Sequence, residues 1–128
     1  MSGFQTGQVF DWCGDATVVH PYIILNDSSK HGGEFVAVNL TESTGGSEAM
    51  VFRVGDHPRI TKDSDVNFGD AFVADEAKLN GDLKCGLATA VSGLFDMAKI
   101  EAIVKRAKTH PAVSRKVQKF LDRAWPHL

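Results

Sequence analysis

Long hydrophobic runs, paired cysteines and a leader-like start are all missing from this chain of 128 residues. No apolar run approaches the ~20 residues that a membrane-spanning helix needs, so we expect no membrane association. The N-terminal Met-Ser-Gly-Phe-Gln-Thr has neither the basic nor the apolar region of a secretory signal. The two cysteines, Cys13 and Cys85, form no CxxC pair. Lone cysteines favour reduced thiols, and therefore a cytoplasmic protein.

Motifs that bind phosphate or metal ions are also missing. The sequence has no GxxxxGK[ST] loop, no GxGxxG, no HExxH and no GxSxG. His20, His31 and His57 show no spacing typical of zinc ligands, so we expect neither a metal nor a cofactor. A metal-dependent hydrolase built around His20 and His57 stays open as a weaker alternative.

Positive charge is scarce in the first three quarters of the chain. Residues 1–98 carry six Lys or Arg against fourteen Asp or Glu, a net charge of −8. Residues 99–128 carry eight against two, a net charge of +6. A basic tail of this kind is typical either of a solvated helix face or of a surface that contacts phosphates or an acidic partner.

Short apolar segments between polar turns predict that the first two thirds are β structure. The predicted strands are 8–12, 22–25, 35–40, 49–54, 66–68 and 71–73, the last two separated by Gly69-Asp70. Close spacing of such strands favours a small barrel over alternating strands and helices. Residues 80–95 are ambiguous, because Gly81, Gly86 and Gly93 interrupt them.

The last third has helical periodicity. Asp96 is placed to cap a helix from about 97 to 108, which His110-Pro111 interrupts. A second helix is predicted to begin with Pro111 near its first position. The sequence thus predicts a barrel over 1–95 and a helical pair over 96–128, within one mainly β domain.

Two of these strands carry the main clue to function. His20-Pro21 opens the first, and Thr41 closes the second after a polar link that ends in Gly32-Gly33. If the two strands pair, His20 and Thr41 come close together. The structural alternatives are a turn-setting histidine before proline and a hydroxyl that caps the next turn.

The order of these segments resembles the MazF/PemK toxin family, and more closely a divergent PemK-like group. The resemblance covers roughly residues 7–79 and rests on Gly7-Gln8-Val9-Phe10, His20-Pro21, Leu25-Asn26-Asp27, Asn39-Leu40-Thr41 and Asp63-Ser64-Asp65-Val66. It implies an SH3-like barrel with helical additions. It also implies a metal-independent endoribonuclease of a toxin–antitoxin pair, usually homodimeric, with single-stranded RNA as substrate and a small antitoxin as partner.

The resemblance also assigns candidate site residues. The family has a catalytic arginine before the proline, where this chain has His20, and a catalytic hydroxyl where it has Thr41. Ser64 matches a serine near the family's active groove, although a turn hydroxyl is the simpler interpretation. The loop over 41–48 matches a wall of that groove.

Cleavage through the 2′-hydroxyl of RNA needs proton transfer and stabilisation of developing negative charge. A histidine suits the acid or base role, because a reference imidazole pKa of about 6.5 lies near neutral pH. An arginine suits the charge, and we name Arg53 or Arg59 as a substitute for the family's arginine. The rings of Trp12, Tyr22 and Phe68 are candidates for stacking on bases, with core packing as the alternative.

A second class of function stays open on this evidence. The chain is then a non-catalytic SH3-like module, in which His20 marks a lost arginine and the basic tail binds a protein or nucleic acid. The acidic body favours this alternative, because RNA-cleaving enzymes normally present a positive groove.

Overall fold

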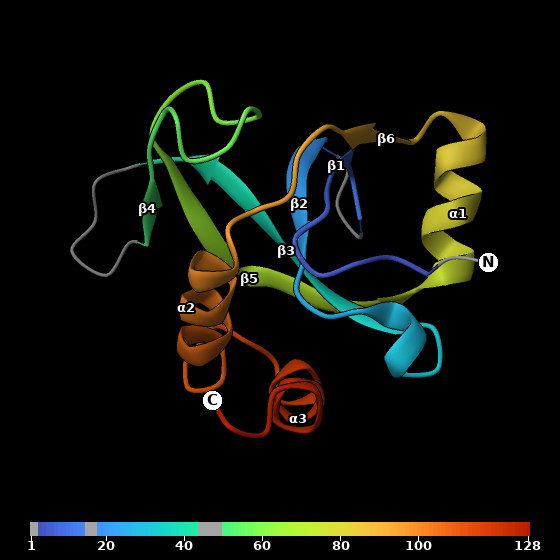
Figure 1. Cartoon of the computed structure of the whole chain (residues 1–128), viewed down its shortest axis with the longest axis vertical. Coiled ribbons are helices and arrows are strands. Elements are labelled where there is room, and N and C mark those ends of the chain that lie inside the picture. The colour runs from blue at the N-terminus through green and yellow to red at the C-terminus, as the bar shows by residue number, and fades with distance from the viewer. Residues whose placement is uncertain (1–2, 15–17, 44–49) are drawn as a thin grey trace.

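A computed structural model of the chain describes residues 3–14, 18–43 and 50–128. Its centre is a six-stranded antiparallel sheet in the order β4-β5-β3-β2-β1-β6 (Figure 1). The strands are β1 (Val9–Trp12), β2 (His20–Ile24), β3 (Glu34–Glu42), β4 (Val51–Phe52), β5 (Ser64–Asp75) and β6 (Ala88–Val91). The helices are η1 (Ser28–Lys30, a 3-10 turn), α1 (Glu76–Cys85), α2 (Met97–Ala107) and α3 (Arg115–Ala124).

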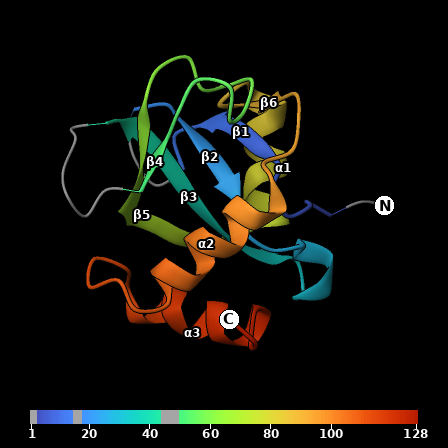
Figure 2. The same ribbon diagram turned by 60° about the vertical axis from the view of Figure 1, so that its left-hand side comes forward.

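The two central strands are buried on both faces, as their continuous apolar runs predict. Tyr22 and Ile24 of β2 pack in one core cluster, whereas Ile23 and the following Leu25 pack in the other. α1 covers the first face through the fully buried Leu79. α2 and α3 lie together on the other face, at the opposite end of the molecule from α1 (Figures 1 and 2). The mainly β prediction is therefore confirmed.

β5 corrects the prediction of two short strands. It runs unbroken through Gly69-Asp70, because β3 and β5 change register between Ala37 and Asn39. The Asp70 carboxylate accepts hydrogen bonds from the side-chain amides of Asn39 at 3.1 Å and Asn67 at 3.0 Å. A polar cluster thus supports the sheet where the sequence pattern is typical of a turn. β4 is shorter than the predicted 49–54, whose first residue lies outside the described residues.

The sequence did not predict β6 or α1. α1 gives the described residues three α-helices in place of the predicted two. The Asp75 side chain caps it by accepting from the Lys78 amide, and Gly86 ends it in the left-handed conformation at φ 80°. Trp12 anchors it to the sheet, since its indole nitrogen donates to the Asp82 carboxylate at 2.7 Å. This bond joins two residues that are 70 positions apart in the chain.

Loss of the Trp12–Asp82 bond is expected to destabilise the fold. Asp82→Ala leaves the indole N–H of the fully buried Trp12 without an acceptor, which costs about 1–3 kcal/mol of unfolding free energy. The hydrogen bond from Trp12 lowers the pKa of Asp82 below 3.8, so its contribution is complete above that pH and disappears as the pH falls through the lowered pKa. Urea denaturation should show a gap between wild type and variant at about pH 7 that narrows at about pH 3. A constant gap would contradict this assignment.

The helical prediction is confirmed for α2 and corrected for α3. Asp96 is the N-cap residue of α2 as predicted, although its side chain makes no capping hydrogen bond. α3 begins at Arg115 and not at Pro111, because the Ser114 hydroxyl accepts from the Val117 amide and caps the helix there. None of the helices among the described residues combines the length and the apolar character needed to cross a membrane.

The two N-caps provide a matched comparison of stability. Ser114→Ala removes a side-chain acceptor and should lower the unfolding free energy by about 1 kcal/mol. Asp96→Ala removes only a carboxylate near the helix N-terminus, which should cost about 0.5 kcal/mol. Thermal or urea unfolding of both variants checks the order, and an equal loss would show that Ser114 does not act as a cap.

Candidate functional site

His20 and Thr41 meet at one end of the sheet, where β2 begins and β3 ends. The paired residues Tyr22 and Asn39 set the register of β2 and β3. His20 precedes Tyr22 by two residues and Thr41 follows Asn39 by two, so both lie at the same end of this strand pair. The predicted pairing of the two strands is therefore confirmed, and it brings both polar side chains to the same strand ends.

A pocket of about 220 Å³ opens at these strand ends. Four of the residues predicted for a site line it, namely His20, Thr41, Arg59 and Ser64, and all four are half-buried. The rest of the lining comes from the same strands and from the loop before β5: Val19, Pro21, Leu40, Glu42, Ile60, Thr61 and Lys62. Residues 44–48 of the predicted groove wall lie outside the described residues.

The strand register divides the polar residues of this pocket between two faces of the sheet. Side chains alternate along a strand, so His20 and Thr41 share the face of Tyr22 and Asn39. Ser64 lies opposite Glu42, on the other face. The pocket opens where the strands end, so residues of both faces border the same space.

The structure distinguishes between the two candidate arginines. The Arg59 Nε donates to the Asp11 carboxylate at 2.8 Å, and none of the described hydrogen bonds uses its two Nη amines. Arg53 instead pairs with Asp63 at 2.8 Å, and its side chain is 71% exposed and outside the pocket lining. Of the two candidate arginines, Arg59 is thus the one that lines the pocket together with His20.

Two further contacts define the electrostatics of the pocket mouth. Lys62 pairs with Glu42 at 3.1 Å, and both side chains are largely exposed. The Ser64 hydroxyl donates to the carbonyl of Lys62 at 2.9 Å, which leaves its oxygen as an acceptor. Exposed ion pairs are weak, so Lys62 can exchange Glu42 for another anion at little cost.

His57 has a structural place in this fold. It is 3% exposed and stacks on Phe95, with ring centroids 5.2 Å apart. Its Nδ1 accepts from the Arg59 amide at 3.0 Å, so its Nε2 carries the proton that bonds the carbonyl of Gly93 at 2.9 Å. Both ring nitrogens are occupied, and the metal-site alternative that paired His57 with His20 is not supported. Within residues 3–14, 18–43 and 50–128, no group of three or more metal-ligating side chains gathers.

The three aromatic candidates take the core-packing alternative and not base stacking. Trp12 is fully buried, and Tyr22 and Phe68 are 1% and 5% exposed. Trp12 packs against Tyr22 and Phe72, at centroid distances of 5.4 Å and 5.3 Å. Trp12 and Tyr22 belong to one core cluster and Phe68 to the other, so these rings offer no open face to a base.

Asp11 is the site residue that sequence reasoning missed. It lies between the buried Phe10 and Trp12 in β1 and reaches Arg59, which is 48 positions away. A lone carboxylate in an otherwise apolar strand was the available signal. Nothing in the sequence indicated which cation it would hold.

Comparisons with known proteins provide a likeness in fold. No protein-family model and no curated protein matches the sequence. Among solved structures, this fold matches a chain from an endoribonuclease in complex with its cognate antitoxin from mycobacterial species. The match has a TM-score of 0.53 at 19% sequence identity, and it covers 89% of this chain and 98% of that chain. At this identity the likeness shows a shared fold.

Proposed function

We propose that this chain is a PemK/MazF-like toxin, an endoribonuclease that cleaves single-stranded RNA. The observation that carries the proposal is the meeting of His20, Thr41 and Arg59 in one pocket. His20 and Thr41 match the positions of the family's catalytic residues, and Arg59 is the substitute for its arginine. The fold that holds them is similar to that of a chain from an endoribonuclease–antitoxin structure. We also propose that this sheet is a form of the SH3-like barrel of that family.

The chemistry that suits these residues is transesterification without a metal. The 2′-oxygen attacks the adjacent phosphorus, the bond to the 5′-oxygen breaks, and a 2′,3′-cyclic phosphate and a 5′-hydroxyl remain. His20 takes the proton from the nucleophile or supplies one to the leaving oxygen. The Arg59 Nη amines stabilise charge on the phosphoryl oxygens, because a guanidinium pairs with phosphate through two parallel bonds.

The remaining pocket residues have supporting roles in this mechanism. The Thr41 hydroxyl donates a hydrogen bond to a phosphate oxygen beside His20. Asp11 is a positioning residue, since its bond to Nε at 2.8 Å directs the Nη edge of Arg59 away from β1. Ser64 accepts a hydrogen bond from the RNA, and Lys62 adds positive charge at the mouth. The partners that we propose are a small antitoxin and a second copy of the chain.

A cleavage assay on defined single-stranded RNA tests the function. The purified chain in EDTA should cut single-stranded RNA and leave the matching duplex intact. Thr41→Val keeps the shape of the side chain and removes the donor, and it should slow cleavage by about tenfold or more. Cleavage that EDTA abolishes would contradict the metal-independent mechanism.

The non-catalytic module predicts a different result in the same assay. On that account RNA is not cut, and expression of the chain does not arrest growth. Arg59 beside His20 favours the enzyme, because it provides the cation that the His20 position lacks. Growth arrest that a neighbouring gene product relieves would separate the two functions.

A further inference from the structure

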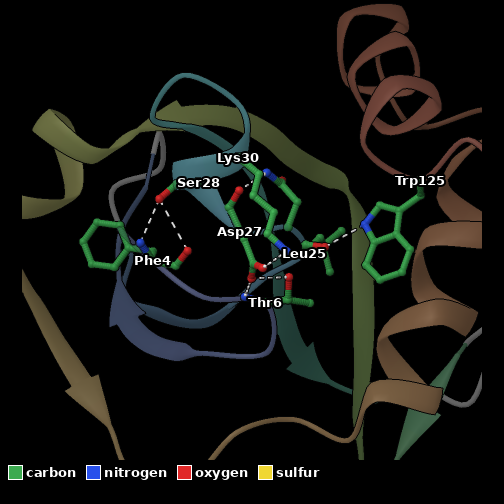
Figure 3. A network of polar contacts seen from close by, with 8 residues as sticks. Phe4, Thr6, Leu25, Asp27, Ser28, Lys30 and Trp125 are labelled. Atoms are coloured by element: carbon green, nitrogen blue, oxygen red, sulfur yellow. Dashed lines mark hydrogen bonds and ion pairs between the residues drawn. The ribbon is translucent and has the colours of Figure 1, made fainter. Parts of the chain in front are cut away.

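A second pocket, of about 310 Å³, lies far from His20. It is bordered by the segment before β1, the link between β2 and β3, and the ends of α2 and α3. Asn26 in its wall follows β2, whereas His20 begins that strand, so about 20 Å separates the two pockets along β2. Figure 3 shows Thr6 and Asp27 on one side of this region and the indole of Trp125 on the other.

Several polar groups in the wall of this pocket are bonded to the protein itself. The Asp27 carboxylate accepts from the amide of Thr6 at 2.8 Å and from its hydroxyl at 2.9 Å, and it pairs with Lys30 (Figure 3). The Trp125 indole nitrogen donates to the carbonyl of Leu25 at 2.9 Å. Asn26 is similarly engaged with the backbone at the start of β3. The side chains of Gln5, His31 and His127 also border the pocket, so polar groups that can bind a ligand remain there.

Part of the remaining surface of the pocket is apolar. Met97, at the first position of α2, is 48% exposed, and it borders the pocket together with Ala124 and Trp125. A pocket of this size lies at the small end of the range for ligand sites, roughly 300–1,000 Å³. It has room for an aromatic side chain or for a pair of aliphatic ones.

Positive charge lies beside this pocket, along α3. Lys116, Lys119 and Arg123 are exposed at helical spacing, so they form one stripe along α3, which ends beside the pocket. The side chain of Lys30 at the rim is 74% exposed but pairs with Asp27 at 3.3 Å, so the α3 stripe is the main positive charge beside the pocket. The carboxylate of Asp122 on α3 pairs with Lys108 at 3.5 Å, so it does not neutralise the stripe.

We propose that this pocket and the α3 stripe dock an acidic segment of a partner protein. The segment places an apolar side chain against Met97 and Trp125, and its carboxylates face Lys119 and Arg123. Charge complementarity selects the acidic partner, and the apolar surface of Met97, Ala124 and Trp125 favours an apolar anchor. The docking surface goes beyond the proposed function, because a chain without RNA cleavage presents the same surface.

A peptide titration followed by fluorescence anisotropy tests the proposal. The probe is a fluorescein-labelled peptide of about twelve residues, with Asp and Glu around a central Leu-Leu. It should bind about tenfold or more tightly than the same peptide with Gly-Gly at its centre. Equal binding of both peptides, or no binding of either, would overturn the apolar anchor.

Variants of the full chain locate the binding site. Ala124→Trp fills the pocket and Met97→Asp makes it acidic, and each should weaken the Leu-Leu peptide by about tenfold. Val54→Asp is the matched control, because Val54 is 65% exposed and lies outside both pocket linings. Arg123→Glu should weaken the binding of both peptides, and Lys84→Glu on α1 is its control. Thermal unfolding of each variant confirms that it is folded.

Two outcomes separate this surface from the RNA site. Wild-type RNA cleavage by Ala124→Trp, together with lost peptide binding, supports a docking surface that is independent of the His20 pocket. Tighter binding of an oligouridylate of equal charge than of the Leu-Leu peptide, weakened by the same variants, would overturn the proposal in favour of a nucleic-acid surface.

Discussion

His20→Ala is expected to reduce RNA cleavage about 10²–10⁴-fold, because it removes the group that we assign to proton transfer. His20 is half-buried at the start of β2 and makes none of the described side-chain hydrogen bonds, so its removal should leave the fold intact. The rate should fall in kcat at saturating RNA, with a much smaller change in KM. Single-turnover cleavage of a short labelled RNA measures the chemical step directly.

His20→Arg provides the informative companion to this variant. It restores the residue that the resembling family has before the proline, next to Arg59. If His20 acts by proton transfer, the arginine cannot replace it at neutral pH and activity stays low. Activity at or above that of wild type would contradict the assigned role and would make charge stabilisation the function of this position.

Arg59→Ala is expected to cost about 10²–10³-fold in cleavage, since it removes the donors aimed at the phosphoryl oxygens. Arg53→Ala is the matched control, because Arg53 is bound to Asp63 at the surface and should stay within about twofold of wild type. Arg59→Lys keeps the charge but loses the bidentate geometry, so we expect intermediate activity. A larger loss for Arg53→Ala than for Arg59→Ala would contradict the choice between them.

Asp11→Asn separates positioning from charge at the same site. The amide keeps an oxygen that accepts from the Arg59 Nε but loses its charge, so a modest loss of about tenfold is expected. Urea denaturation of Asp11→Asn and Arg59→Ala measures how much of the lost cleavage comes from a lower free energy of unfolding. A positioning role requires that Asp11→Asn changes nothing further once Arg59 is already alanine.

The central hairpin and α2 could be predicted because their signals are local. The apolar residues of β2 and β3 are consecutive in sequence and bounded by turn residues, and α2 repeats its buried residues at helical spacing. α1 lacks such a signal, since Leu79 is its only fully buried side chain among the described residues. Its position depends on the Trp12–Asp82 bond, which sequence spacing does not encode.

Only the part of the candidate site that depends on local signals could be predicted from the sequence. His20 and Thr41 follow from the pairing of two neighbouring strands. The choice of Arg59 depends on Asp11 and on the buried turn around His57, and both contacts exist only in the folded chain. Trp12 was a candidate for binding RNA and lies in the core. The sequence near a polar turn does not indicate which way an aromatic ring points.

The ends of the cut RNA test the central claim most directly. Purified wild-type chain, incubated with a short single-stranded RNA in EDTA, should leave 2′,3′-cyclic phosphate and 5′-hydroxyl ends by mass spectrometry. His20→Ala, prepared in the same way, should yield about a hundredfold less of these products in the same time. Uncut RNA with folded wild type, or products with 5′-phosphate ends, would contradict the assignment of the His20 pocket.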